Sequence, residues 1–153
     1  GGHHAGQDTV QPRLCRHPAQ FPRRRRQCRQ LDQGNGETDD IIAVIRHAKE
    51  RFGEMPLLLA GFSFGGFVQT RVAKQVTAER LVLVGPAVSR FPTEAVPANT
   101  LVIHGEHDEV VPLAAVFDWA RPQQLPVVVV PGGEHFFHGR LHLLAQIVRV
   151  HCA

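Results

Sequence analysis

The 153 residues provide enough chain for one domain with a single hydrophobic core. The three cysteines include no Cys-x-x-Cys pair, so a disulfide framework is not expected, and no apolar run approaches the roughly 20 residues that span a bilayer. No charged-then-apolar signal sequence opens the chain, and we expect a cytoplasmic protein with no membrane partner. The net charge of +3 is uneven, because residues 1–33 hold seven Arg against two Asp.

Residues 1–33 differ in character from the rest of the chain. They contain few large apolar residues and show neither strand nor helix periodicity, which predicts an irregular segment before a core domain over residues 34–153. The Arg23–Arg26 run has the charge to neutralise nucleic-acid phosphates. No aromatic residues are interleaved with it, so we expect no nucleic-acid partner.

From Gly34 onward, helical and strand patterns alternate. Thr38 is expected to cap a helix that ends at Gly53 and turns Ile41, Ile45, Ala48 and Phe52 inward. Apolar strands are predicted at residues 56–60, 81–84, 100–104 and 126–130. Further helices are predicted up to about Gln75, over residues 112–120 and over residues 137–150, the last with Leu141, Leu144 and Val148 inward. This pattern predicts an α/β fold, in which a mostly parallel sheet carries helices on both faces and the chemistry at the carboxyl ends of its strands.

Gly61-Phe62-Ser63-Phe64-Gly65 is a G-x-S-x-G motif between a predicted strand and a predicted helix. The turn is so sharp that only glycine is expected to fit two residues on either side of the serine. Strained backbone at Ser63 would raise its hydroxyl above the sheet, and the helix that follows would aim amides at an anion. The motif predicts Ser63 as a nucleophile.

Asp108 follows the third strand and His135 follows the fourth, where Gly132 and Gly133 let the loop bend toward the serine. A carboxylate in this position can accept the imidazole Nδ1–H and orient the ring as a base for the serine. The order serine, acid, histidine, with each residue after its own strand, is the order that a fold of this kind imposes on such a triad. Glu106 and Glu109 remain alternative acids at this stage.

A zinc site is the main rival reading of the histidines. His135, His138 and His142 include a pair spaced i, i+4. On the predicted last helix, however, His138, His142 and Arg149 share the face opposite the apolar residues. A solvated face explains them, and we expect no metal and no cofactor.

Gly36-Glu37-Thr38-Asp39-Asp40, Leu59-Ala60 with the serine motif, and Pro131-Gly132-Gly133-Glu134-His135-Phe136-Phe137-His138-Gly139 carry a resemblance. They are similar to the α/β-hydrolase superfamily, and more narrowly to its small lidless bacterial members related to dienelactone hydrolases. The resemblance covers about residues 34–150. It implies a triad of Ser63, Asp108 and His135, an oxyanion donor at the Phe64 amide, and a carboxylesterase, thioesterase or dienelactone-hydrolase-like activity. The substrate would be a small soluble acyl compound, since residues 85–99 are too few for a helical lid.

The resemblance stops before Gly34. Family members place there a strand, a helix, a second strand and a Gly-rich loop that supplies the second oxyanion donor. Residues 1–33 do not resemble these elements, so we expect a fold incomplete at its N-terminus, from a frameshifted or truncated gene, and weak activity at best. The alternative function is a catalytically impaired α/β-hydrolase-fold protein that acts as an interaction module. The oligomeric state is not predicted.

Overall fold

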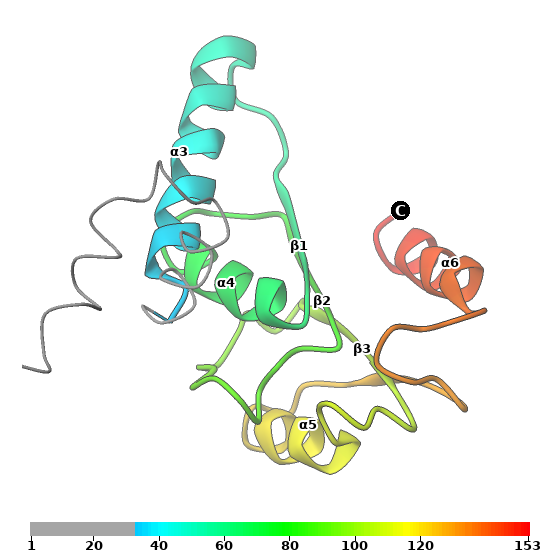
Figure 1. The fold of residues 1–153 in the computed structure, drawn as a ribbon. Coiled ribbons are helices and arrows are strands. Elements are labelled where there is room, and N and C mark those ends of the chain that lie inside the picture. Colours follow the sequence, from blue (N-terminus) through cyan, green and yellow to red (C-terminus); the bar gives the residue numbers. More distant parts are fainter. Residues whose placement is uncertain (1–32) are drawn as a thin grey trace, which may run out of the picture. The chain divides into compact units, whose positions relative to one another are not determined.

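A computed structural model describes residues 33–153 (Figure 1). The expectations for residues 1–32, including the irregular segment, the missing family elements and the Arg23–Arg26 run, lie outside the described residues. In the described part, the strands are β1 (Leu58–Phe62), β2 (Arg80–Val84), β3 (Leu101–Gly105) and β4 (Val128–Val130). The helices are α3 (Asn35–Phe52), α4 (Phe64–Val72), α5 (Leu113–Ala120) and α6 (Leu141–His151), with a short 3₁₀ turn at Arg121–Gln123.

The strands of the described part form one parallel sheet in the order β1-β2-β3-β4, which confirms the predicted parallel α/β sheet. β1 and β4 each begin two residues later than predicted, after Pro56 and Pro126. Proline has no amide hydrogen for the sheet ladder, so the paired strand starts beyond it. At its other end β1 continues through Gly61 and Phe62, which pair with Leu83 and Val84 of β2. The sheet therefore reaches the residue directly before Ser63.

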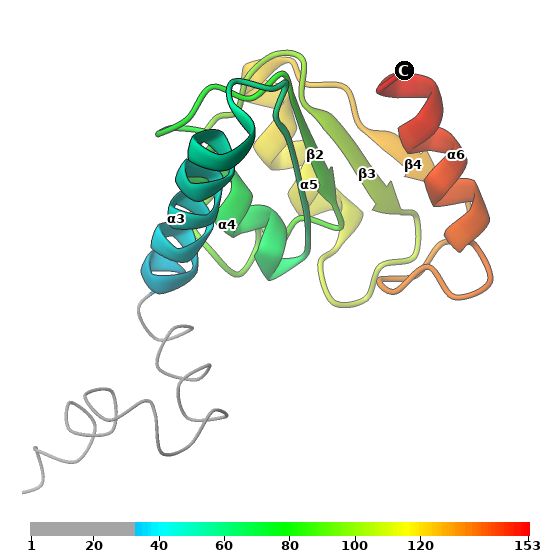
Figure 2. The ribbon, with the colours of Figure 1, turned by 90° about the horizontal axis from the view of Figure 1, so that it is seen from above.

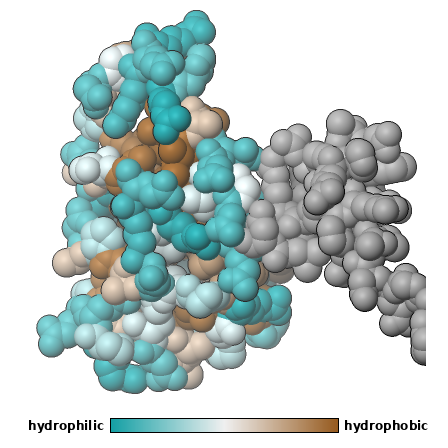
Figure 3. All heavy atoms as spheres, turned by 90° about the vertical axis from the view of Figure 1, so that its left-hand side faces the viewer, coloured by the Kyte–Doolittle hydropathy of each residue, from teal (hydrophilic) through white to brown (hydrophobic). Residues whose placement is uncertain are grey.

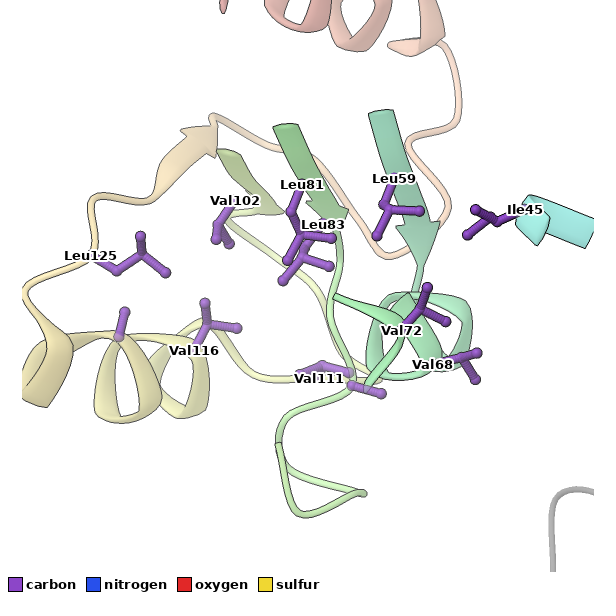
Figure 4. Packing of buried hydrophobic residues seen from close by; sticks show 12 residues of the cluster. Ile45, Leu59, Val68, Val72, Leu81, Leu83, Val102, Val111, Val116 and Leu125 are labelled. Carbon is purple, nitrogen blue, oxygen red and sulfur yellow. The ribbon is translucent and has the colours of Figure 1, made fainter. Parts of the chain in front are cut away.

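Both faces of the sheet are covered, as the alternation of side chains requires. Leu81 and Leu83 of β2 and Val102 of β3 belong to a core cluster with residues of α4 and α5. Figure 4 shows these side chains lying between the strands and the two helices. Val82 and Ile103 belong to a second core cluster, together with residues of α6. Figure 2 shows α6 on the other side of the sheet from α4.

The helix α3 begins earlier than predicted. It starts at Asn35, after Gln33 and Gly34 with φ of 58° and 80°, so Thr38 is a buried residue of the helix and not its cap. The left-handed backbone of the two residues before Asn35 cannot belong to a right-handed helix, so the helix begins at Asn35 and not after Thr38. The predicted end is confirmed, since Gly53 has a φ of 76° and donates its amide to the Lys49 carbonyl over 2.9 Å.

The inward face predicted for α3 is partly wrong. Ile45 is buried and Ile41 packs against the core, but Phe52 is 64% exposed. Phe52 lies at the end of the helix and, with Met55 and Leu57, lines an apolar depression of about 240 Å³. Figure 3 shows a hydrophobic area enclosed by hydrophilic residues on the side that carries α3. The helical period alone could not reveal that this last turn has no core beneath it.

The last helix starts later than predicted. Phe137 and Gly139 have φ of 55° and 72°, which a right-handed helix cannot contain, so α6 begins at Leu141. Leu144 and Val148 face the core as predicted, together with Leu143 and Ile147, whereas Leu141 is 64% exposed and its inward assignment is wrong. His138 precedes the helix and does not share a helical face with His142.

The connection between β2 and β3, residues 85–100, contains no helix. Two side chains at the C-terminal end of α5 and just beyond it hydrogen-bond to this connection. Gln123 Oε1 accepts the Val96 amide over 3.0 Å, and the Trp119 indole donates to the Thr93 carbonyl over 3.1 Å. The expectation that no helical lid fits here is met. None of the helices within residues 33–153 has the length and apolarity needed to span a bilayer.

Candidate active site

Ser63 lies in the sharp turn between β1 and α4, with φ of 53° and ψ of −119°. This backbone conformation is strained for a residue other than glycine and costs on the order of 1–3 kcal/mol. The Ser63 amide donates to the Val84 carbonyl over 2.9 Å, which ties the turn to the end of β2. Ser63 stands at the N-cap of α4, but its side chain makes no capping bond. The hydroxyl Oγ instead lies 3.2 Å from His135 Nε2.

Of the two glycines that flank Ser63 in the motif, only Gly61 leaves no room for a side chain. A Cβ built on Gly61 would lie 2.5 Å from the Gly65 carbonyl carbon and 2.6 Å from the Gly66 nitrogen. A Cβ on Gly65 would meet nothing within 4 Å. The expectation that only glycine fits at Gly65 is therefore wrong, because its Cβ would point away from the strand.

Gly61→Ala should lower the free energy of unfolding by about 1–3 kcal/mol, since backbone atoms on the first turn of α4 would have to move. Gly65→Ala is the matched control. It should leave stability unchanged or raise it by up to about 1 kcal/mol, because Ala is the better helix former. Urea unfolding monitored by circular dichroism measures both. Equal losses in the two variants would contradict this account of the turn.

His135 and Asp108 meet at the carboxyl ends of β4 and β3. His135 Nδ1 lies 2.6 Å from Asp108 Oδ2, and both side chains are buried. The second carboxylate oxygen, Oδ1, accepts the amides of Val110 and Val111 over 2.9 and 2.7 Å. The carboxylate is thus held by backbone donors on one side and by the imidazole on the other.

The two alternative acids occupy other positions. Glu106 accepts the Gly132 amide over 2.9 Å, and Glu109 is exposed. The three chain segments that follow β1, β3 and β4 therefore bring Ser63, Asp108 and His135 into one hydrogen-bonded series.

Comparison with known proteins shows which proteins the chain resembles. A family model described as serine aminopeptidase, S33 matches residues 26–97. A lidless α/β serine hydrolase from Xanthomonas campestris is 36% identical over 78% of the chain, with a TM-score of 0.74. An α/β serine hydrolase homologue from Coxiella burnetii is 34% identical over 78% of the chain, with a TM-score of 0.68. The chain has the α/β-hydrolase fold and resembles these bacterial serine hydrolases.

The chain covers 56% of the Xanthomonas protein and 60% of the Coxiella protein. No curated protein sequence matches it significantly. The fold class and the resemblance to small lidless bacterial members are confirmed. The catalytic roles of Ser63, Asp108 and His135 stay predictions.

The amide expected to bind an oxyanion at this site is that of Phe64, the first residue of α4. The Gly66 and Phe67 amides both donate to the Ser63 carbonyl, over 3.0 and 3.3 Å. The first amides of a helix have no acceptor within it, so the Phe64 N–H is suited to an external anion. The expectation that the second donor, from a Gly-rich loop, is missing concerns residues 1–32, which the structure does not describe.

His104, at the end of β3, was not predicted to belong to the site. It is fully buried, and its Nε2 lies 2.7 Å from the Val111 carbonyl oxygen and 3.4 Å from Asp108 Oδ2. Burial lowers the pKa of His104 below its ordinary value of 6.5, an effect that the Val111 carbonyl and the Asp108 carboxylate partly offset. The neutral ring therefore donates from Nε2 and braces the loop that holds Asp108. The sequence did offer a signal for this role, because His104 is a polar residue at the end of an apolar strand, four positions before Asp108.

His104 should make folding sensitive to acid. Because its pKa is lowered in the folded protein, the unfolded chain takes up the proton first as the pH falls below about 6.5. The contribution of the neutral ring is complete above that pH and is lost below it. We expect urea midpoints to fall more between about pH 7.5 and 5.5 in the parent chain than in His104→Gln, which keeps a donor but cannot titrate. Equal losses would contradict the assignment.

The three histidines considered for zinc do not come together. Both ring nitrogens of His135 have partners in Asp108 and Ser63, His138 pairs with Glu134 over 3.2 Å, and His142 is exposed on α6. Among residues 33–153, no group of three or more His, Cys, Asp or Glu side chains is arranged to hold a metal ion.

Proposed function

We propose that this chain is a serine hydrolase that cleaves an ester, thioester or similar acyl bond of a small soluble substrate through an acyl-enzyme. The observation that carries the proposal is the hydrogen-bonded series from Ser63 Oγ to His135 Nε2, 3.2 Å, and from His135 Nδ1 to Asp108 Oδ2, 2.6 Å. Such a series is the arrangement that activates a serine hydroxyl.

In the first half of the reaction, Ser63 Oγ attacks the acyl carbon while its proton moves to His135 Nε2. Asp108 stabilises the imidazolium, and the Phe64 amide binds the negative oxygen of the tetrahedral intermediate. The bond to the leaving group then breaks, and His135 returns the proton to the departing atom. In the second half, water attacks the acyl-enzyme, His135 takes its proton, and the acid leaves as the proton returns to Ser63.

The connection after β2 supports a small and soluble substrate. Residues 85–100 contain no helix, and their tether to Trp119 and Gln123 holds them beside α5. A site without a lid offers little apolar enclosure for a long acyl chain. We further propose that the protein acts in the cytoplasm and without a cofactor.

The rival is a protein that keeps the fold without turnover and serves as an interaction module. A fluorophosphonate probe followed by peptide mapping separates the two. A native hydrolase should carry the adduct on Ser63, and an unlabelled native chain would support the interaction module.

A further inference from the structure

The imidazole of His135 contacts two phenylalanine rings, which also contact each other. The Phe62 ring centroid is 4.9 Å from that of His135 at an interplanar angle of 41°, and the Phe136 centroid is 5.0 Å away at 82°. The two phenylalanine centroids lie 5.9 Å apart. His135 is only 3% exposed, whereas Phe62 and Phe136 are 41% and 57% exposed. The rings thus cover the base and present their own surface to solvent.

The backbone holds Phe136 in this outward position. Phe137, the next residue, is fully buried and has a φ of 55°, so the chain turns one ring into the core and leaves its neighbour outside. The Glu134 carboxylate accepts the amides of Phe136 and His138 and braces the same turn. The exposed ring is therefore a feature of an ordered loop, positioned before any substrate arrives.

Single exposed apolar residues are ordinary on protein surfaces. This pair is different because Phe62 directly precedes Ser63, Phe136 directly follows His135, and both rings contact the base. In the proposed reaction His135 Nε2 returns its proton to the leaving atom, so the leaving group lies on the histidine side of the acyl carbon. Substituents on that atom would extend over the two rings.

We propose that Phe62 and Phe136 form a leaving-group subsite that selects acyl esters of aromatic or similarly apolar alcohols. This inference rests on the proposed function and adds the substrate class to it. Aromatic rings stack offset or edge to face at centroid separations of about 4.5–7 Å, which a ring resting on either phenylalanine can adopt. The same surface offers a polar or charged alcohol no hydrogen-bond partner from these two side chains.

The test compares benzyl acetate with methyl acetate, which share the acyl group and whose alcohols have similar acidity. The value of kcat/KM, which reports events up to formation of the acyl-enzyme, should be about tenfold higher for the benzyl ester. In Phe136→Ala the ratio of benzyl to methyl values should fall about tenfold. Phe117→Ala, which removes an exposed ring from α5, is the matched control and should keep the parental ratio.

A second series with a fixed methyl alcohol, methyl acetate and methyl phenylacetate, separates the two sides of the scissile bond. The assignment would be overturned if Phe136→Ala changed the ratio of methyl phenylacetate to methyl acetate values and not the ratio of benzyl to methyl acetate values. So would a parental benzyl-to-methyl ratio near one, or one that Phe136→Ala leaves unchanged, while Ser63-dependent hydrolysis persists. If the parent chain hydrolysed these esters no faster than Ser63→Ala does, the proposed function would be rejected, and the subsite with it.

Discussion

Replacing Ser63 by Ala should abolish both acyl-ester turnover and covalent labelling by a fluorophosphonate, because its hydroxyl is the atom that forms the acyl bond. The expected loss is the full rate above the uncatalysed reaction, on the order of 10⁶ by analogy with triad serine hydrolases. The fold should survive, since the Ser63 side chain makes no capping bond to α4 and the turn is held by the backbone bond from Ser63 to Val84.

Two measurements accompany this variant. Circular dichroism and urea unfolding should match the parent chain, which shows that lost labelling is chemical and not structural. Thr70→Ala serves as a matched hydroxyl control, since Thr70 donates within α4 to the Phe67 carbonyl over 2.6 Å. It should retain labelling. If Ser63→Ala were labelled or hydrolysed esters at the parental rate, Ser63 would not be the nucleophile.

Asp108→Asn should lower kcat by on the order of 10⁴, by analogy with the serine protease triad. Oδ1 of Asp108 accepts two backbone amides, from Val110 and Val111. An asparagine must keep its carbonyl oxygen there, so its NH₂ group would face His135 Nδ1. The imidazole would then have to accept at Nδ1 and carry its proton on Nε2, where it cannot take the proton of Ser63.

Glu106→Gln and Glu109→Gln are the controls for this prediction. Glu106 binds the Gly132 amide and Glu109 is exposed, so both variants should stay within about tenfold of the parental kcat. The values come from steady-state kinetics on a short-chain acyl ester. A larger loss in either glutamate variant than in Asp108→Asn would mean that the acid has been assigned to the wrong residue.

The strands, the helices and the turn at Ser63 could be predicted from the sequence. The apolar strands and the helices between them follow from side-chain periodicity, which a single chain displays without knowledge of its partners. The G-x-S-x-G motif, with a strand before it and a helix after it, predicted the turn in which Ser63 has a φ of 53°. Boundaries were less accurate, because they depend on single residues such as Phe137, whose left-handed backbone delays α6.

The solvent exposure of individual side chains could be predicted less well than the helices and strands that carry them. Phe52 and Leu141 fit the inward faces of their helices by period, yet each is 64% exposed. A helical pattern shows which residues share a face, but whether another element covers the end of that face depends on how far the sheet and its neighbours extend. The same holds for Gly65, whose freedom from contact depends on the path of α4 relative to β1.

The sequence by itself determined the class of fold, the three residues that follow β1, β3 and β4, and the chemistry that their types allow. Only the tertiary structure decided that Asp108, and neither nearby glutamate, meets His135, and that His104 braces the loop behind it. The partners of His135 are 27 and 72 positions away along the chain. Periodicity and motifs report on neighbours a few residues apart, whereas contacts across such separations exist only once parallel strands bring their carboxyl ends to one edge.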